Sequence, residues 1–329
     1  MHGIASLSLE WARRSAVTGL SAAVIVAVWG TPIPAAAKHR GPTGACYRVS
    51  QDSQLACQNS AQDDYWIAVA KCDNAPSDSN AARAANDCRK SALDDEQAAF
   101  KDCRDQLSAR NDVCTQLGGG PYAPEIDPAD FTHSTTIDNP LNPFPPGKTY
   151  HYRTNTAAGV ELDAVTVTND TRTIDGIECV AVRDVVKLDG DLTEDTTDWY
   201  AQDDSGNVWY FGEDSRQFEG GVLTGNEGSW MAGVDGAFPG ILMKANPAVG
   251  DVYRQEYAIG DAEDVAQVVA TGQTVSVPYG SFNNALETRE FSGLEPDANE
   301  NKYYVSNVGD VLEVDLQTGD RTELVSITP

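Results

Sequence analysis

The sequence predicts an α+β protein in which a disulfide-stapled antiparallel helical hairpin precedes a mostly antiparallel β domain. Two observations lead to this fold class. Six of the seven cysteines are spaced symmetrically within residues 38–118, as expected for two helices that face each other. From residue 148 onwards, short β-branched and aromatic runs alternate with Gly, Asn and Asp turns, without helical stretches between them. The β domain, residues 148–329, is therefore expected to form a curved sheet, a half-barrel or a barrel.

Residues 1–37 have the features of an export signal peptide. Arg13 and Arg14 precede an apolar run at residues 16–29, and three alanines at 35–37 offer a cleavage site. The run is too short to span a bilayer stably, and no second one follows it. We therefore expect no membrane span, a mature chain that begins near Lys38, and a secreted or periplasmic protein.

The cysteines of residues 38–118 form a palindrome. They occupy positions 46, 57, 72, 88, 103 and 114, and the outer, middle and inner pairs each sum to 160. Residues facing each other across an antiparallel hairpin have a constant sum of positions, and spacings of 11 and 15 return to one helix face. The pattern predicts three nested disulfides, which would replace a core and require an oxidising compartment. The predicted pairs are Cys46–Cys114, Cys57–Cys103 and Cys72–Cys88.

Small residues are expected along the seam, because disulfides bring helices closer than ordinary packing does. Ala61 opposes Ala99 and Ala68 opposes Ala92, again with sums of 160.

The hairpin also has signals for its turn and its end. We expect a turn at residues 74–79, in which Pro76 ends the first helix and Asp78 or Ser79 caps the second. Three glycines at 118–120 would end the second helix.

Residues 119–147 are rich in proline and glycine and predict an extended linker that contains the domain boundary. The prolines exclude helix and central strand. Phe131, Leu141 and Phe144 are expected to anchor this linker on the surface of the β domain.

The acidity of the chain belongs to the linker and the β domain. Without Glu10, Arg13 and Arg14 the mature chain has 21 basic and 49 acidic residues, a net charge of −28, and residues 119–329 hold 11 of the basic and 37 of the acidic ones. Such a field repels nucleic acid and anionic membranes and favours cations or basic partners. It is equally typical of a solvated acidic surface.

The aromatic residues concentrate in residues 198–257, which contain ten of the 26 in the chain. Any binding site is expected here, partly under an irregular loop at residues 220–250. No motif of a known hydrolase, phosphate loop or zinc site is present, so no catalytic residue is assigned. Cys179 is expected in the core, and His151 on the solvent side of its strand. The candidate binding residues are Trp199, Trp209, Tyr210, Glu213, Glu227, Trp230, Asp235 and Arg254.

Three functions are compatible with these residues. The first is a non-enzymatic binding or interaction module for a small apolar ligand or a protein partner, with a cavity lined by Trp199, Trp209 or Trp230 on the concave face of the sheet. The second is a hydrolase that uses paired carboxylates on a carbohydrate. The third is a structural protein stabilised by Ca²⁺. The alternative to all three is that the acidic residues are structural, capping turns and pairing with Arg216 and Arg254.

Several segments together resemble a family of uncharacterised exported bacterial proteins: DWYAQDDSGNVWYFGED, GSWMAGVDGAFPGI, GDVYRQEY, VPYGSF and KYYVSNVGDVLEV. The resemblance covers most of residues 139–327 and implies no activity or catalytic residue. The final segment also resembles the last hairpin of bacterial half-barrel lipoproteins, whose concave sheets bind lipid or other apolar ligands.

Overall fold

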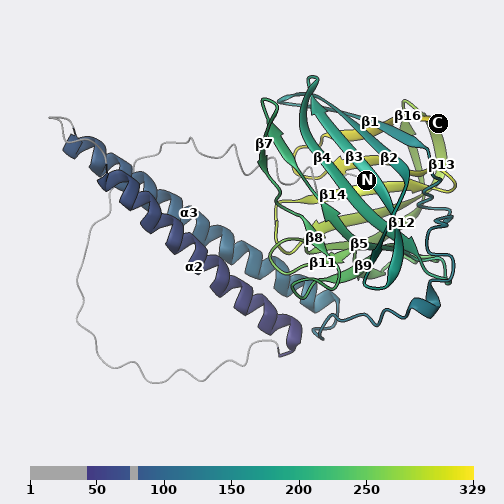
Figure 1. Cartoon of the computed structure of the whole chain (residues 1–329), viewed down its shortest axis with the longest axis horizontal. Coiled ribbons are helices and arrows are strands. Elements are labelled where there is room, and N and C mark those ends of the chain that lie inside the picture. The colour runs from purple at the N-terminus through teal and green to yellow at the C-terminus, as the bar shows by residue number, and fades with distance from the viewer. Residues whose placement is uncertain (1–42, 75–80) are drawn as a thin grey trace.

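A computed structural model describes residues 43–74 and 81–329 of the chain. The predicted signal peptide and the predicted turn with Pro76 and its Asp78 or Ser79 cap lie outside the described residues. Two long helices form a rod beside a large antiparallel sheet that is nearly closed and barrel-shaped (Figure 1). The predicted fold class is thus confirmed. None of the helices in the described part is long and apolar enough to cross a membrane.

Helices α2 (Ala45–Asp73) and α3 (Ala81–Gln116) form the hairpin. All three predicted disulfides are present, and in each the two Cα atoms are 5.6–5.7 Å apart. Ala61 and Ala92 are buried in the seam, so small residues do allow this close approach. Beyond α3, Gly118 and Gly119 have φ angles of +82° and +73°, the left-handed conformation that ends helices. Cys179 is the free cysteine and is buried, as expected.

The linker is more than a connector, because it contributes to the core of the β domain. Phe131, Ile137 and Phe144 are buried among residues of the sheet, and Phe144 is fully enclosed beside Tyr200. Leu141 packs against the same core with partial exposure. The linker contains one short 3₁₀ helix, η2 (Pro128–Asp130), which the prediction of no helix missed, and turns at residues 132–135, 140–141 and 146–147.

Sixteen strands make up the β domain. They are β1 (Thr149–Thr156), β2 (Gly159–Ile174), β3 (Ile177–Leu188), β4 (Asp191–Gln202), β5 (Val208–Asp214), β6 (Gln217–Glu219), β7 (Val222–Gly225), β8 (Trp230–Met231), β9 (Phe238–Met243), β10 (Val252–Arg254), β11 (Glu256–Tyr257), β12 (Asp264–Val277), β13 (Gly280–Ser292), β14 (Asn299–Val305), β15 (Gly309–Asp315) and β16 (Arg321–Thr328). The segment 220–250, expected to be an irregular loop, therefore contains β7, β8 and β9.

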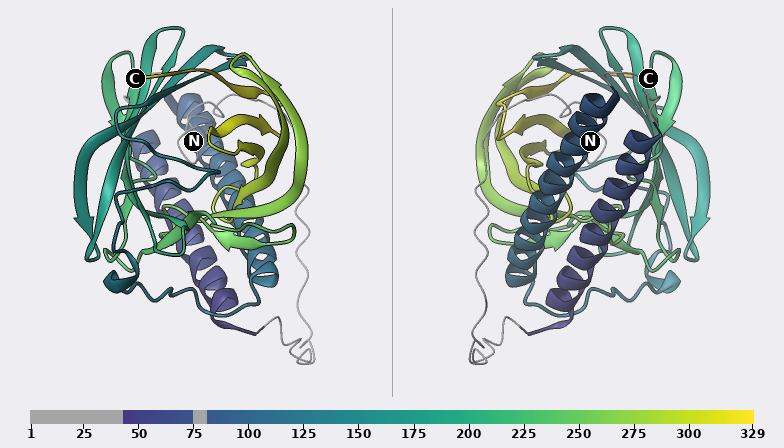
Figure 2. Two further views of the ribbon diagram at one scale, coloured as in Figure 1. Left: turned by 90° about the vertical axis from the view of Figure 1, so that its right-hand side faces the viewer. Right: turned by 90° about the vertical axis from the view of Figure 1, so that its left-hand side faces the viewer.

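The order of the strands brings the two ends of the sheet close together. The main path runs β10-β12-β13-β14-β15-β16-β1-β2-β3-β4-β5-β9-β11, and every pairing is antiparallel. β10 and β11 are the two ends of this path, yet only Gln255 separates them in the chain. At this point Gly240 of β9 approaches so closely that a Cβ atom would lie 2.2 Å from the backbone of Gln255. The two halves of the curved sheet face each other in Figure 2.

The inner face of the sheet mixes apolar and acidic side chains. On β2, for example, Asp163, Val165 and Val167 are all buried, as period-2 alternation requires. Lys302 is 2% exposed and lies 3.1–3.4 Å from carboxylates of Glu290, Glu300 and Glu313. Burial alone would lower the pKa of Lys302, but the three carboxylates raise it well above its ordinary value. The lysine therefore stays charged inside the sheet.

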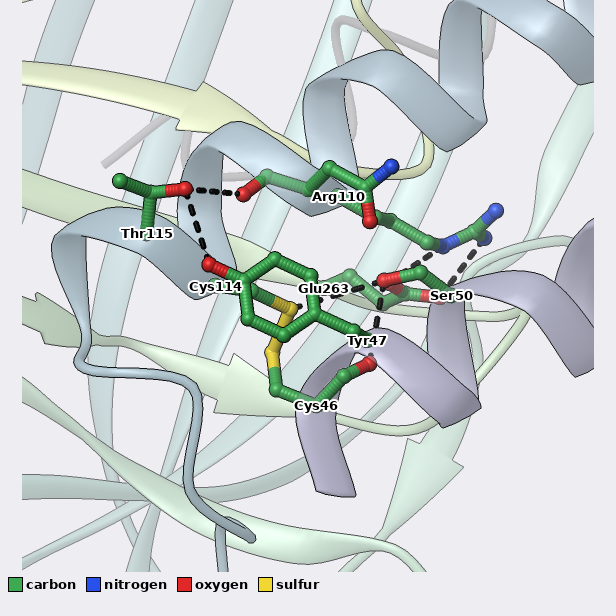
Figure 3. The surroundings of a disulfide bond; sticks show 8 residues. Cys46, Tyr47, Ser50, Arg110, Cys114, Thr115 and Glu263 are labelled. Carbon is green, nitrogen blue, oxygen red and sulfur yellow. Dashed lines mark hydrogen bonds and ion pairs between the residues drawn. A yellow bond between two sulfur atoms is a disulfide. The ribbon is translucent and has the colours of Figure 1, made fainter. Parts of the chain in front are cut away.

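One buried ion pair fixes the hairpin to the β domain. Arg110 of α3 donates two 2.8 Å hydrogen bonds to the carboxylate of Glu263, which lies between β11 and β12 (Figure 3). Their side chains are 5% and 3% exposed. The absence of a side chain at Gly293 makes room for Arg110, whose Cγ would lie 2.9 Å from a Cβ atom there. The Cys46–Cys114 disulfide lies one helical turn away on α3. At this end of the hairpin the disulfide joins the two helices to each other, and the ion pair joins α3 to the β domain.

Replacement of Arg110 by Ala should lower the free energy of unfolding by about 3–5 kcal/mol, because Glu263 would then be a buried charge without its counter-ion. The double variant Arg110→Leu/Glu263→Leu should lose less than Arg110→Ala. Urea unfolding followed by tryptophan fluorescence measures both changes. Arg89→Ala, which breaks an exposed pair with Asp73, is the control and should cost about 1 kcal/mol or less. Equal losses in Arg110→Ala and Arg89→Ala would contradict a structural role for the buried pair.

Candidate functional site

A pocket of about 350 Å³ lies where β4, β5 and β8 meet the loops around residues 232–237 and 258–261. We call it the Trp199–Trp230 pocket, after the two indoles in its lining. It brings together four of the eight candidate residues. Its lining consists of Arg172, Trp199, Glu213, Asp214, Asn226, Ser229, Trp230, Met231, Val234, Asp235, Ala237, Ala258, Ile259 and Asp261. Half of these residues are polar, so the pocket is less apolar than expected.

The two tryptophans reach the pocket from different faces of the sheet. On β4, Tyr200 stacks on Tyr210 inside the sheet, and alternation places Trp199 on the opposite, outer face. Trp230 of β8 packs edge-on against Tyr210, and its Nε1 donates a 2.9 Å hydrogen bond to Glu256. The pocket thus lies beside the outer face and the rim of the sheet, whereas the cavity predicted from the sequence lies on the concave face.

A glycine makes this arrangement possible. Gly212 of β5 has a φ of +149°, and a Cβ atom there would lie 2.6 Å from the backbone oxygen of Trp230. Any larger residue would push β8, and with it Trp230, away from β5. Sequence pattern alone does not reveal this requirement, because Gly212 reads as an ordinary strand glycine in VWYFGED.

The pocket is acidic. Four carboxyl groups line it, from Glu213, Asp214, Asp235 and Asp261, together with the cation of Arg172. Asp214 is ion-paired with Arg216 and Glu213 is buried with a raised pKa, so Asp235 and Asp261 supply the negative charge that faces the pocket. Burial raises the pKa of Asp261, and the charges of Asp235 and Glu263 raise it further. The guanidinium of Arg172 lies 4.7 Å from the ring centroid of Trp199 and so covers that indole. A cation that binds here gains attraction from the carboxylates and from the aromatic rings.

The floor of the pocket connects to a buried carboxyl–phenol triad, Asp198, Tyr210 and Glu213. The hydroxyl of Tyr210 lies 2.6 Å from a carboxyl oxygen of each acid. Burial, together with both carboxyls, raises the pKa of Tyr210 well above its ordinary value, so it remains a phenol with one hydrogen. A phenol has one hydrogen and makes one strong linear hydrogen bond as a donor. Two contacts of 2.6 Å are therefore both satisfied when one of the acids is itself protonated and donates to the phenol oxygen.

The pKa values agree with this count of protons. Burial raises the pKa of Asp198 to about 7, although the hydrogen bond from Tyr210 opposes the shift. The pKa of Glu213 is raised well above its usual range by burial and by the charge of Asp198. Glu213 both belongs to the triad and lines the pocket, which gives the pocket a carboxyl group with a raised pKa.

The other candidate residues lie elsewhere. Trp209 packs against Phe131 and donates to Asp203 at 2.8 Å, outside the pocket. Glu227 does not line the pocket; its backbone oxygen accepts a hydrogen bond from Gln217.

The expectation that Arg254 pairs with a carboxylate is wrong. Its guanidinium stacks on the rings of Tyr257 and Tyr122, at 4.2 and 5.6 Å from their centroids. Burial lowers its pKa, and no ion pair to Arg254 occurs among the described residues. Arg216, by contrast, does pair with a carboxylate, that of Asp214 at 2.6 Å.

The Ca²⁺ hypothesis finds no ready-made ligand set. Within residues 43–74 and 81–329, no three His, Cys, Asp or Glu side chains are placed to hold a metal ion. His151 is half-buried and lies 3.1 Å from Thr328, on the opposite side of β1 from the buried Tyr150 and Tyr152, as expected.

Sequence reasoning missed Arg172, Asp198 and the loop at 258–261. The signal for Asp198 was its alternation with Glu194 and Thr196 on β4, which marks one face of that strand. Arg172 and the loop carried no such signal, because their place beside the pocket depends on the closure of the sheet.

No family model, no curated protein and no solved structure matches the chain. The site is therefore interpreted from its own geometry.

The raised carboxyl pKa values predict a stability that falls with rising pH. Burial raises the pKa of Asp198 and of Glu300 to about 7 and that of Asp264 to about 8. Between the unfolded and folded pKa values the native state binds more protons, so the free energy of unfolding should decrease from pH 5 to pH 8. Asp198→Asn should flatten this slope by up to about 1.4 kcal/mol per pH unit, measured by urea unfolding.

The matched control is Asp214→Asn, at a carboxylate that is half exposed and ion-paired with Arg216. It should leave the slope as in the parent protein. A stability that rises between pH 5 and pH 8 would contradict the buried, protonated carboxyls.

Proposed function

We propose that this protein is a secreted or periplasmic binding module whose β domain holds a small ligand in the Trp199–Trp230 pocket. The ligand we propose is a cation with a flat or apolar body, and the protein acts without catalysis. Three disulfides and no membrane-spanning helix among the described residues are consistent with a location outside the cytoplasm.

The observation that carries the proposal is the meeting of two indoles with the carboxylates of Asp235 and Asp261 around one pocket. The volume of about 350 Å³ lies at the small end of ligand sites. The excess of carboxylates disfavours an anion, and the indole of Trp199 already binds the guanidinium of Arg172. A ligand cation would replace that intramolecular contact at a similar position.

The hairpin serves in this proposal as a spacer or docking element. Its two helices project from the sheet as a rod, and the three disulfides make that rod stiff (Figure 1). The pair Arg110–Glu263 joins the rod to the segment at 258–263 that lines the pocket, so the base of the hairpin and the pocket share one support.

Calorimetric titration with benzylammonium and with benzoate tests this function, because the two probes share a ring and differ in charge. We expect benzylammonium to bind and benzoate not to bind. Asp235→Asn should weaken benzylammonium binding about tenfold, the loss of one charge contact. Asp235 has a φ of +50°, a conformation that Asn also adopts readily, so the fold should be kept.

Trp209→Phe is the control, since Trp209 lies outside the pocket, and it should bind benzylammonium as the parent does. Preference for benzoate, or equal binding by Asp235→Asn and the parent, would refute the proposed ligand class.

A second function, carboxylate-dependent hydrolysis of a carbohydrate, is favoured by the triad. Glu213 can donate a proton into the pocket, and Asp235 and Asp261 line the same pocket as possible bases for a water molecule. In such a reaction the proton of Glu213 passes to the glycosidic oxygen as its bond to carbon breaks. Water then adds to that carbon, and its proton goes to the base.

Hydrolysis of methylumbelliferyl glycosides decides between the two functions. If the protein is a hydrolase, Glu213→Gln should reduce turnover about a hundredfold or more, because the amide cannot supply the proton. Glu227→Gln, outside the pocket, should retain full turnover. The absence of turnover by the parent protein across the glycosides tested would leave binding as the function.

A further inference from the structure

A second concave region of about 360 Å³ lies on the outer face of β16, β1, β2 and β3, away from the Trp199–Trp230 pocket. These four strands are consecutive neighbours in the sheet and lie together in Figure 1. We call this region the outer-face groove. Its exposed and half-buried lining consists of His151, Arg153, Leu162, Ala164, Val185, Lys187 and Val325. The buried residues Tyr152 and Asp163, which are 2% and 3% exposed, complete the lining.

The strand register explains how these residues come together. Arg153 lies opposite Leu162, and Leu162 lies opposite Lys187, so the leucine is flanked by two cations across three strands. In the next row of the same face, Ala164 lies opposite Val185. Val325 belongs to the irregularity where β16 slips against β1, which turns it towards this face. Leu162 and Val325 are 48% and 39% exposed, so the apolar centre faces solvent.

The charge of the groove is opposite to that of its domain. Residues 119–329 have 37 acidic and 11 basic side chains, yet Arg153 and Lys187 border this groove. Among the described residues neither cation has an ion pair: Arg153 donates to the amide oxygen of Asn155, and Lys187 has no partner.

The carboxylates nearest to the two cations either point into the sheet or are paired with an arginine. Asp163 is 3% exposed and belongs to the inner face of β2. Glu323, opposite Arg153, pairs with Arg321, and Asp195, opposite Val185, pairs with Arg183 through two 2.7 Å contacts. Two cations therefore remain available to an anion from solution.

The sheet limits what can bind. β16, β1, β2 and β3 are each hydrogen-bonded to neighbours on both sides, so they have no free edge to which a peptide strand can add. A ligand must bind through side chains alone, with an apolar body over Leu162 and Val325 and a negative group at Arg153 or Lys187.

We propose that the outer-face groove binds the carboxylate and alkyl chain of a single-chain fatty acid. The alkyl chain lies over the exposed leucine and valine, and the carboxylate accepts charge-assisted hydrogen bonds from Arg153 or Lys187. This site is separate from the proposed cation pocket and does not depend on it.

Calorimetric titration with decanoate and with decyltrimethylammonium, each below its micelle concentration, tests the proposal. The two probes share a ten-carbon chain and differ in head-group charge. Residues 38–329 have a net charge of −28 and attract the cationic probe in general, so tighter binding of decanoate would identify a local cationic site. We expect that preference in the full mature protein with its disulfides intact.

Arg153→Gln combined with Lys187→Gln should weaken decanoate binding about tenfold or more, and Leu162→Gln should weaken it as well. All three positions are exposed, so the fold should tolerate these changes. Arg289→Gln is the matched control, because Arg289 is an exposed arginine on β13 that does not line the groove. Asp235→Asn should bind decanoate as the parent does, which separates this site from the cation pocket.

Three results would overturn the proposal: no binding of decanoate, tighter binding of decyltrimethylammonium, or equal decanoate affinity in the double variant and in Arg289→Gln. Binding of a glutamate-rich peptide without binding of decanoate would assign the groove to an acidic protein partner instead.

Discussion

β10 and β11 follow each other in the chain and stand at opposite ends of the sheet, so a single residue, Gln255, brings the two ends together. The other features of the β domain depend on this closure. It removes the inner face from water, and the buried carboxyls there hold protons that they would lose in solution. It also places β8, β9 and the 258–261 loop beside β4 and β5, which creates the Trp199–Trp230 pocket.

The hairpin is stabilised by disulfides, whereas the β domain is stabilised by a hydrophobic core. Two helices alone bury little apolar surface, and three disulfides compensate by restricting the unfolded chain. The sheet has a large core to which the linker adds Phe131 and Phe144. The buried pair Arg110–Glu263 joins the two parts and ends close to the pocket wall. The two parts are thus attached by a rigid contact as well as by the linker.

Charge separates the two proposed sites. The carboxylates of the Trp199–Trp230 pocket favour a cation, whereas Arg153 and Lys187 give the outer-face groove an attraction for an anion. Both sites use side chains on the closed sheet, and the buried network around Lys302 leaves that residue unavailable to either. A strongly acidic protein can in this way bind ligands of both signs at separate places.

The sequence by itself determined the hairpin, its three disulfide pairs, the antiparallel β domain and the anchoring role of Phe131 and Phe144. These follow from local periodicity and from sums of positions, which need no knowledge of distant contacts. Of the eight candidate site residues, Trp199, Glu213, Trp230 and Asp235 do line one pocket. Only the tertiary structure placed Trp209, Tyr210, Glu227 and Arg254 outside its lining and brought Arg172 and Asp261 in. Their positions depend on the closure through Gln255 and on the bulges of β4 and β5, and neither leaves a periodic pattern in the chain.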